Sequence, residues 1–191
     1  MTGVVHGDIK PENVLVNKGS EPSTFGVKMT DFGYSCYGST DEDFVRLPRS
    51  QPWEAPEYHP RWFTLAAAKK TDMYSFGLLC LWLLFPGEVL ITHLGEINLD
   101  LAFGGEKGQP QAQLETLKQE GGILDYTLEL LSRHSGLDEG ICSRLRSVFN
   151  LSLHLDPAKR ASTMHHFVEL LFEDEVPQYD CFLDYPIING N

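Results

Sequence analysis

The residues best suited to chemistry lie in one short segment, His6-Gly-Asp-Ile-Lys-Pro-Glu-Asn13. In-line transfer of a phosphoryl group needs a carboxylate that orients and deprotonates the attacking hydroxyl, a cation beside the moving group and oxygen ligands for Mg²⁺. Asp8, Lys10 and Asn13 supply these types in that order, and a tight loop can bring them together. The alternative is an ordinary turn in which Asp8 and Asn13 only hydrogen-bond to the backbone.

A second candidate carboxylate follows the next strand-like stretch. Asp31, in Thr30-Asp-Phe-Gly33, stands at the end of that stretch, before a glycine that lets the chain turn. D-F-G is too short to identify a site by itself. Two further segments follow in order, Arg49-Ser-Gln-Pro-Trp-Glu-Ala-Pro-Glu57 and Thr71-Asp-Met-Tyr-Ser-Phe-Gly77. The order and spacing of these segments restrict the interpretation more than any one of them does.

Together these segments resemble the C-terminal lobe of eukaryotic protein kinases, with its catalytic-loop, D-F-G and A-P-E signatures in the same order. The resemblance implies that Asp8 is the catalytic base and Lys10 the cation on the phosphate side. It implies that Asn13 and Asp31 are the Mg²⁺ ligands and that ATP is the phosphoryl donor.

The same resemblance implies supporting roles for four residues. His6 is expected to be a packed structural member of the loop, and Asp72 to accept backbone N–H groups from it. Glu57 resembles the A-P-E glutamate, whose family partner is an arginine, matched here by Arg160. Loss of either member of a buried ion pair typically costs about 3–5 kcal/mol, so both should stabilise the lobe.

Lys10, together with Ser50 before the A-P-E segment, resembles the serine/threonine class of protein kinases rather than the tyrosine class. The implied reaction is Mg²⁺-dependent transfer of the ATP γ-phosphoryl group to a serine or threonine hydroxyl of a protein or peptide substrate. Many members of the family have an arginine where Gly7 stands, and that arginine binds a phosphorylated activation loop. Gly7 therefore argues against this mode of activation.

The surrounding pattern predicts a mainly α-helical fold with short β-hairpins. A hairpin is predicted from the two segments Asn13–Val16 and Gly26–Thr30. From Glu54 onward the pattern predicts a mostly helical body. Helix starts are predicted at Thr71-Asp72, Asp138 and Ser162. We expect a kinase-like C-terminal lobe over residues 1–172 and an acidic, aromatic tail over residues 173–191.

The ATP-holding parts of this family precede the catalytic loop: a glycine-rich loop, a strand lysine and a helix glutamate. Only five residues precede His6, and G-x-G-x-x-G does not occur in the sequence. We therefore expect a domain incomplete at its N-terminus, inactive as given, which needs other domains of a longer chain to bind ATP and Mg²⁺ productively. Two alternatives remain: a non-catalytic kinase-like binding or regulatory module, and a small-molecule phosphotransferase of the aminoglycoside or choline kinase type. Lys10-Pro11, Ala55-Pro-Glu57 and the helix at Asp72 argue against the second.

Composition restricts the partners and the location. The net charge of −12 argues against binding to nucleic acid or to an anionic membrane surface, since both favour a basic face. The longest apolar run, residues 77–85, is well short of the roughly 20 residues that cross a bilayer. The start lacks a signal-peptide pattern and the four cysteines are widely separated, so an intracellular protein, cytoplasmic or nuclear, is expected.

Overall fold

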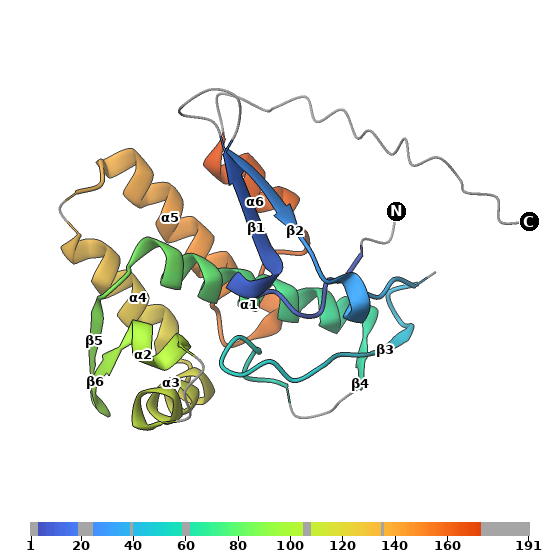
Figure 1. The fold of residues 1–191 in the computed structure, drawn as a ribbon, viewed down its shortest axis with the longest axis horizontal. Coiled ribbons are helices and arrows are strands. Elements are labelled where there is room, and N and C mark those ends of the chain that lie inside the picture. The colour runs from blue at the N-terminus through green and yellow to red at the C-terminus, as the bar shows by residue number, and fades with distance from the viewer. Residues whose placement is uncertain are drawn as a thin grey trace, which may run out of the picture.

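The computed structural model describes residues 4–18, 25–38, 40–58, 62–104, 108–134 and 136–172; the predicted tail lies outside the described residues. Within these ranges the chain is mainly helical, as predicted, and carries three antiparallel strand pairs (Figure 1). None of the described helices is long and apolar enough to span a membrane.

The predicted hairpin follows the candidate loop. A 3-10 turn, η1 (Pro11–Asn13), leads into β1 (Val14–Lys18), which pairs with β2 (Phe25–Met29) so that Val14 lies opposite Met29. Thr30 continues from β2 and donates its backbone N–H to the carbonyl of Asn13 at 2.9 Å. The hairpin therefore fixes the end of one candidate loop beside the start of the next.

The central helix, α1 (Leu65–Leu84), begins six residues before the predicted start at Thr71, which was wrong. Thr64 is its N-cap and accepts a hydrogen bond from the backbone N–H of Ala67 at 3.2 Å. Residues 65–70 read Leu-Ala-Ala-Ala-Lys-Lys and favour helix strongly, so the first turns form before the buried stretch begins. Figure 1 shows α1 crossing the middle of the molecule.

A short strand pair holds the segment that precedes α1. β3 (Phe44–Arg46) pairs with β4 (Trp62–Thr64), which leads directly into the helix. Beneath this pair, apolar side chains from the chain start, the strand pair and α1 form one buried cluster: Val5, Val45, Leu47, Tyr58, Phe63, Leu65 and Ala68. The cluster ties the candidate loop to the central helix.

Beyond α1 the chain first forms an unpredicted strand pair, β5 (Val89–Thr92) with β6 (Gly95–Asn98). The body after Glu54 is mostly helical, as expected, with β4, β5 and β6 as short strands within it. The β-branched residues of β5 and β6 favour strand, and Gly95, at φ 103°, permits the tight turn between them. The remaining elements are α2 (Leu99–Phe103), α3 (Gln109–Glu120), α4 (Gly122–Arg133), α5 (Glu139–Ser152), η3 (Pro157–Lys159) and α6 (His165–Leu171).

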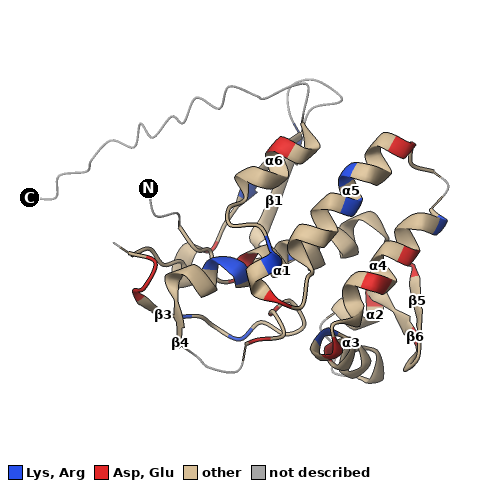
Figure 2. Ribbon diagram, turned by 180° about the vertical axis from the view of Figure 1, so that it is seen from behind, with Lys and Arg blue, Asp and Glu red and all other residues tan. Residues whose placement is uncertain are grey.

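Two of these helices test the predicted starts. Asp138 caps α5 by accepting from the backbone N–H of Ile141 at 2.9 Å, which confirms the prediction. The start at Ser162 was wrong, because the Ser162 hydroxyl accepts from Lys70 Nζ at 3.3 Å and α6 begins at His165. The larger core cluster joins α1 to α2, α3, α4 and α5, and acidic and basic residues are both spread over the outer helices (Figure 2).

Candidate phosphoryl-transfer site

The candidate loop is suspended from α1 by one carboxylate. Asp72 Oδ2 accepts the backbone N–H of His6 at 2.6 Å, and Oδ1 accepts that of Gly7 at 2.9 Å. Asp72 is 6% exposed, and this burial raises its pKa to about 6, although the two N–H groups act in the opposite direction. The backbone of the loop is thereby fixed to the most buried element of the fold.

His6 links this loop to the segment before Asp31. One ring nitrogen, Nε2, lies 3.0 Å from the carbonyl oxygen of Thr30, and the other, Nδ1, lies 3.4 Å from the backbone nitrogen of Asp8. A carbonyl can only accept and a backbone N–H can only donate. In the arrangement that satisfies both contacts, Nε2 donates to the Thr30 carbonyl and Nδ1 accepts from the Asp8 N–H, so the ring holds two backbone segments together.

Gly7 has a conformation that explains why an arginine does not stand there. Its φ is 79°, in the left-handed region that side chains other than glycine rarely adopt. A Cβ at this position would lie 3.0 Å from Leu47 Cδ2 and 3.1 Å from the carbonyl oxygen of Tyr34. Leu47 therefore packs directly on the loop, in space that a side chain at position 7 would need.

Asp8 is the centre of the site and is 4% exposed. Its Oδ2 lies 2.8 Å from Lys10 Nζ and accepts from Asn13 Nδ2 at 3.0 Å, while Oδ1 accepts from the hydroxyl of Ser50. Burial favours the neutral acid, but the hydrogen bonds from Lys10, Ser50 and Asn13 and the lysine charge outweigh it and lower the pKa of Asp8. The carboxylate is therefore ionised at neutral pH.

Asn13 and Asp31 offer oxygen ligands on adjoining segments. Asn13 Nδ2 donates to the backbone carbonyl of Asp8 at 2.8 Å as well as to its carboxylate, so its two N–H donors face inward and its Oδ1 remains for another partner. Asp31 is exposed and left-handed at φ 58°, and it accepts only a long 3.4 Å bond from the backbone of Gly33. An amide oxygen and a carboxylate are ligand types that Mg²⁺ accepts beside phosphate oxygens.

Among the described residues, no hydrogen bond or ion pair joins Asp31 to Asp8, Lys10 or Asn13. The structure thus brings four of the predicted residues into direct contact: Asp8, Lys10, Asn13 and Ser50. Asp31 is linked to them only through Thr30, whose backbone N–H and hydroxyl both bond the Asn13 carbonyl.

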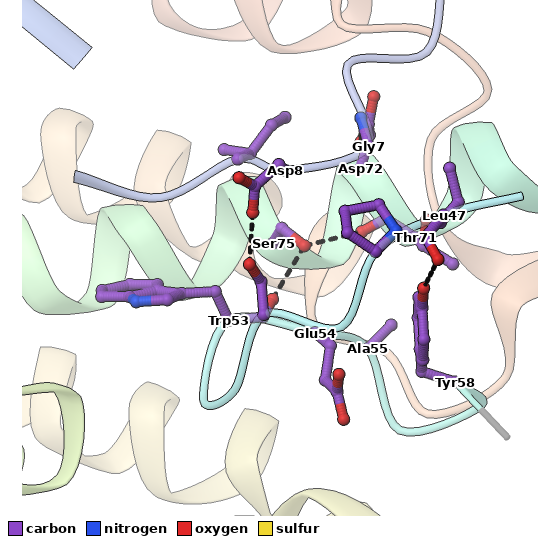
Figure 3. A pocket seen from close by; sticks show the side chains of 13 residues that line it. Gly7, Asp8, Leu47, Trp53, Glu54, Ala55, Tyr58, Thr71, Asp72 and Ser75 are labelled. Atoms are coloured by element: carbon purple, nitrogen blue, oxygen red, sulfur yellow. Dashed lines mark hydrogen bonds between the residues drawn. The ribbon is translucent and has the colours of Figure 1, made fainter. Parts of the chain in front are cut away.

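The segment that carries Ser50 is held on α1 from below (Figure 3). Ser75 donates its hydroxyl to the carbonyl of Trp53 at 2.8 Å, and the Tyr58 hydroxyl donates to the carbonyl of Leu47. Trp53 stacks on Phe103 with ring centroids 4.6 Å apart. The sequence did not predict the supporting roles of Thr30, Ser75 and Tyr58, because each contributes through a contact across more than ten residues.

An ion pair closes the far end of this segment. Arg160 Nη1 and Nη2 bond Glu57 Oε1 and Oε2 at 2.6 and 2.9 Å, and the guanidinium also donates to the carbonyls of Lys70, His154 and Leu155. The arginine side chain is fully buried and lies 4.6 Å from the ring centre of Tyr74. Glu57 and Arg160 therefore join the Ser50 segment, α1 and the turn before α6.

Comparison with known proteins places the chain beside protein kinases. A family model described as the protein kinase domain matches residues 1–172. The leucine-rich repeat receptor-like protein kinase TDR of Arabidopsis thaliana is 33% identical over 95 residues, which cover 50% of this chain and 8% of that protein. Receptor-like protein kinase 5 of the same plant is 33% identical over 101 residues, covering 50% and 9%. The probable serine/threonine-protein kinase fhkB of Dictyostelium discoideum is 30% identical over 111 residues, covering 55% and 10%. The chain spans about a tenth or less of the length of these relatives.

Proposed function

The chain belongs to the protein kinase family, and from this premise we propose that it carries the acceptor side of a serine/threonine kinase site. The proposed reaction transfers the γ-phosphoryl group of ATP to a serine or threonine hydroxyl of a protein. The observation that carries the proposal is the convergence of Lys10, Asn13 and Ser50 on the ionised Asp8 carboxylate. The names of several relatives, which include serine/threonine-protein kinases, support the acceptor class.

In this proposal each residue has a separate task. Asp8 orients the acceptor hydroxyl and takes its proton, and its low pKa keeps it ionised for that role. Lys10, bound to Asp8 at 2.8 Å, provides positive charge beside the transferred group. Ser50, bonded to the same carboxylate, sets the position of the polypeptide segment that a substrate would contact. His6, Asp72, Glu57 and Arg160 position these groups without touching the reacting atoms.

Asn13 and Asp31 are the residues that would hold Mg²⁺, through the Asn13 Oδ1 and the Asp31 carboxylate. The ion would neutralise charge on the phosphate oxygens of ATP. Asn13 is held in place by its two bonds to Asp8, whereas the exposed Asp31 is less constrained. Binding of the nucleotide is expected to order Asp31 rather than Asn13.

We further propose that the described residues form the C-terminal lobe of the kinase domain and that a second part holding the ATP phosphates completes the site. The β1–β2 hairpin supports this, because Leu15, Val16, Phe25 and Val27 are each more than half exposed beside the site. Phosphoryl transfer depends mostly on positioning and electrostatics, so the 191 residues alone should transfer phosphate at a negligible rate. The predicted intracellular location stays a prediction.

A direct test compares the 191-residue chain with a version extended upstream through its gene. Both would be incubated with radiolabelled ATP, Mg²⁺ and peptides that carry serine, threonine or tyrosine as the only acceptor. We expect the extended version to label serine and threonine peptides in a Mg²⁺-dependent reaction and the 191 residues alone to label none. Labelling of a small-molecule acceptor instead, or no transfer by the extended version, would contradict the proposal and, in the second case, favour a non-catalytic module.

A further inference from the structure

A groove beside the candidate site contains a buried carboxylate oxygen without a partner. The groove lies between residues 49–58 and α3, and Arg49, Gln51, Glu54, Glu115, Thr116 and Gln119 line it. Glu54 is 7% exposed, and its Oε2 has no hydrogen-bond partner, the only such buried side-chain atom among the described residues. Figure 3 shows the Glu54 side chain leaving its segment on the side away from Thr71 and Ser75.

This arrangement is incomplete as it stands. A buried acceptor without a donor costs about 1–3 kcal/mol, and more when it is charged. The other Glu54 oxygen, Oε1, bonds Arg49 Nη2 at 3.0 Å, but the Arg49 side chain is 57% exposed and uses one nitrogen only. The geometry of Glu54 therefore leaves room for a second donor.

A cation would match the charge of the unpartnered Glu54 oxygen. Glu54 pairs only with the exposed Arg49 among the described residues, whereas Glu115, the other carboxylate of the groove, is already paired with Lys118. Lys118, the positive charge behind them, is fully buried and already donates to the carbonyl of Pro52 at 2.7 Å and to Glu115 Oε1 at 2.9 Å. These bonds join α3 to the Ser50 segment, and neither of them reaches Glu54.

The groove is also close to the reacting groups. A smaller hollow, lined by Asp8 and Ser50, shares Glu54, Ala55 and Tyr58 with it. A polypeptide whose serine reached Asp8 would therefore place a neighbouring residue over Glu54. The net charge of −12 would favour the approach of a basic segment.

We propose that Glu54 is a specificity-determining residue, and that the groove binds the side chain of an arginine or lysine near the acceptor hydroxyl of the substrate protein. The inference rests on the proposed kinase function. The cation donates to Glu54 Oε2, while Glu115 remains paired with Lys118. A guanidinium fits this role better than an ammonium group, because its planar fork can engage a carboxylate with two parallel bonds.

The test measures peptide binding to the protein expressed from its full gene. Fluorescent peptides would carry a central serine and one arginine, placed at each position in turn, with lysine and uncharged citrulline replacing the arginine at the best position. We expect the arginine peptide to bind about tenfold more tightly than its citrulline counterpart, as one charge-assisted hydrogen bond provides. Equal binding of arginine and citrulline peptides at every position would overturn the proposal.

Matched variants assign the effect to Glu54. Glu54→Gln keeps the size of the side chain and should abolish the preference for arginine, whereas Glu96→Gln removes the same charge from an exposed strand and should leave it unchanged. Arg49→Gln frees Oε1 and should strengthen binding of the arginine peptide, a gain that a purely structural role of Glu54 does not produce. Thermal melting would confirm that each variant is folded.

An arginine preference that survives Glu54→Gln in a folded protein would contradict the assignment, as would weaker binding in Arg49→Gln. The outcome is separable from that of the kinase proposal, because no phosphate transfer is measured. Glu54-dependent binding without any phosphotransfer would support the proposed arginine-binding groove and contradict the proposed kinase function. Phosphotransfer without an arginine preference would support the kinase function and contradict the groove.

Discussion

At the scale of single residues, the site depends on two buried aspartates with opposite electrostatics. Asp8 receives hydrogen bonds from Lys10, Asn13 and Ser50, which lower its pKa in spite of burial. Asp72 receives two backbone N–H groups, and burial outweighs them. The Asp8 carboxylate is thus held in its ionised form, whereas burial disfavours the ionised form of Asp72, which fixes the loop through its two hydrogen bonds.

The raised pKa of Asp72 predicts a specific dependence of stability on pH. Between its ordinary value of 3.8 and its folded value of about 6, the folded protein binds a proton that the unfolded chain does not. Lowering the pH through this range should therefore raise the free energy of unfolding of the wild type, by on the order of 1–3 kcal/mol, relative to Asp72→Asn. Denaturant titrations of both proteins at pH 6.5 and 4.5, chosen to lie roughly above and within this range, would measure it.

The variant Asp72→Asn also loses one acceptor for the His6 and Gly7 backbone, so it should be less stable than the wild type at both pH values. The titration of Asp72 is therefore measured by comparing two differences in the free energy of unfolding between the wild type and Asp72→Asn, one at each pH. If this difference is the same at both pH values, the raised pKa of Asp72 is contradicted.

At this scale the sequence predicted the contacts within the candidate loop well, because the residues that make them are close in sequence. Asp8, Lys10 and Asn13 lie within six residues, and a tight turn is enough to bring them together. The unpartnered oxygen of Glu54 and the buried Lys118 could not be predicted in this way. Each depends on how α3 packs against residues 49–58. A lysine in a polar helical pattern is normally predicted to be solvent-exposed, whereas Lys118 is buried.

At the scale of elements, the fold uses α1 as the support for three separate segments. Asp72 on α1 holds the candidate loop, Ser75 holds the Ser50 segment, and the carbonyl of Lys70 receives Arg160. Gly77 allows α5 to approach closely, since a Cβ there would lie 2.7 Å from Leu153 Cδ2. The relative positions of the loops are therefore set by one helix.

The Glu57–Arg160 pair should contribute most to holding these elements together. Arg160→Ala removes five hydrogen bonds and leaves Glu57, whose side chain is 27% exposed, without its partner. We expect a loss of about 3–5 kcal/mol in the free energy of unfolding. Arg133→Ala is the control, because Arg133 pairs with Glu129 on the exposed face of α4 and should contribute under about 0.5 kcal/mol. Similar losses in the two variants would contradict this account.

Element boundaries were the least predictable part of the fold. The start of α1 was placed too late because the apolar stretch after Thr71 is more conspicuous than the cap at Thr64. The strands β5 and β6 were not predicted, because each is only four residues long. The loop–strand–loop order around β1 and β2 was correct, since the alternating pattern and the intervening polar stretch both indicate a hairpin.

At the scale of the whole molecule, the candidate site lies beside an exposed apolar hairpin. Asn13 precedes β1 and Asp31 follows β2, so the two proposed Mg²⁺ ligands lie at the same end of the hairpin, next to its exposed apolar residues. A nucleotide held there by a second part of the kinase domain would meet both. The proposal thus connects the burial pattern of the described residues with the need for a further ATP-holding part.

The measurement that tests the central claim most directly is the rate of phosphate transfer to a serine peptide by the upstream-extended protein and by its Asp8→Asn variant. Asp125→Asn, on the exposed surface of α4, is the matched control. If Asp8 is the base, Asp8→Asn should lower the rate constant by about 10²- to 10⁴-fold while Asp125→Asn leaves it unchanged. A folded Asp8→Asn protein that transfers phosphate at the wild-type rate would contradict the assignment of this site.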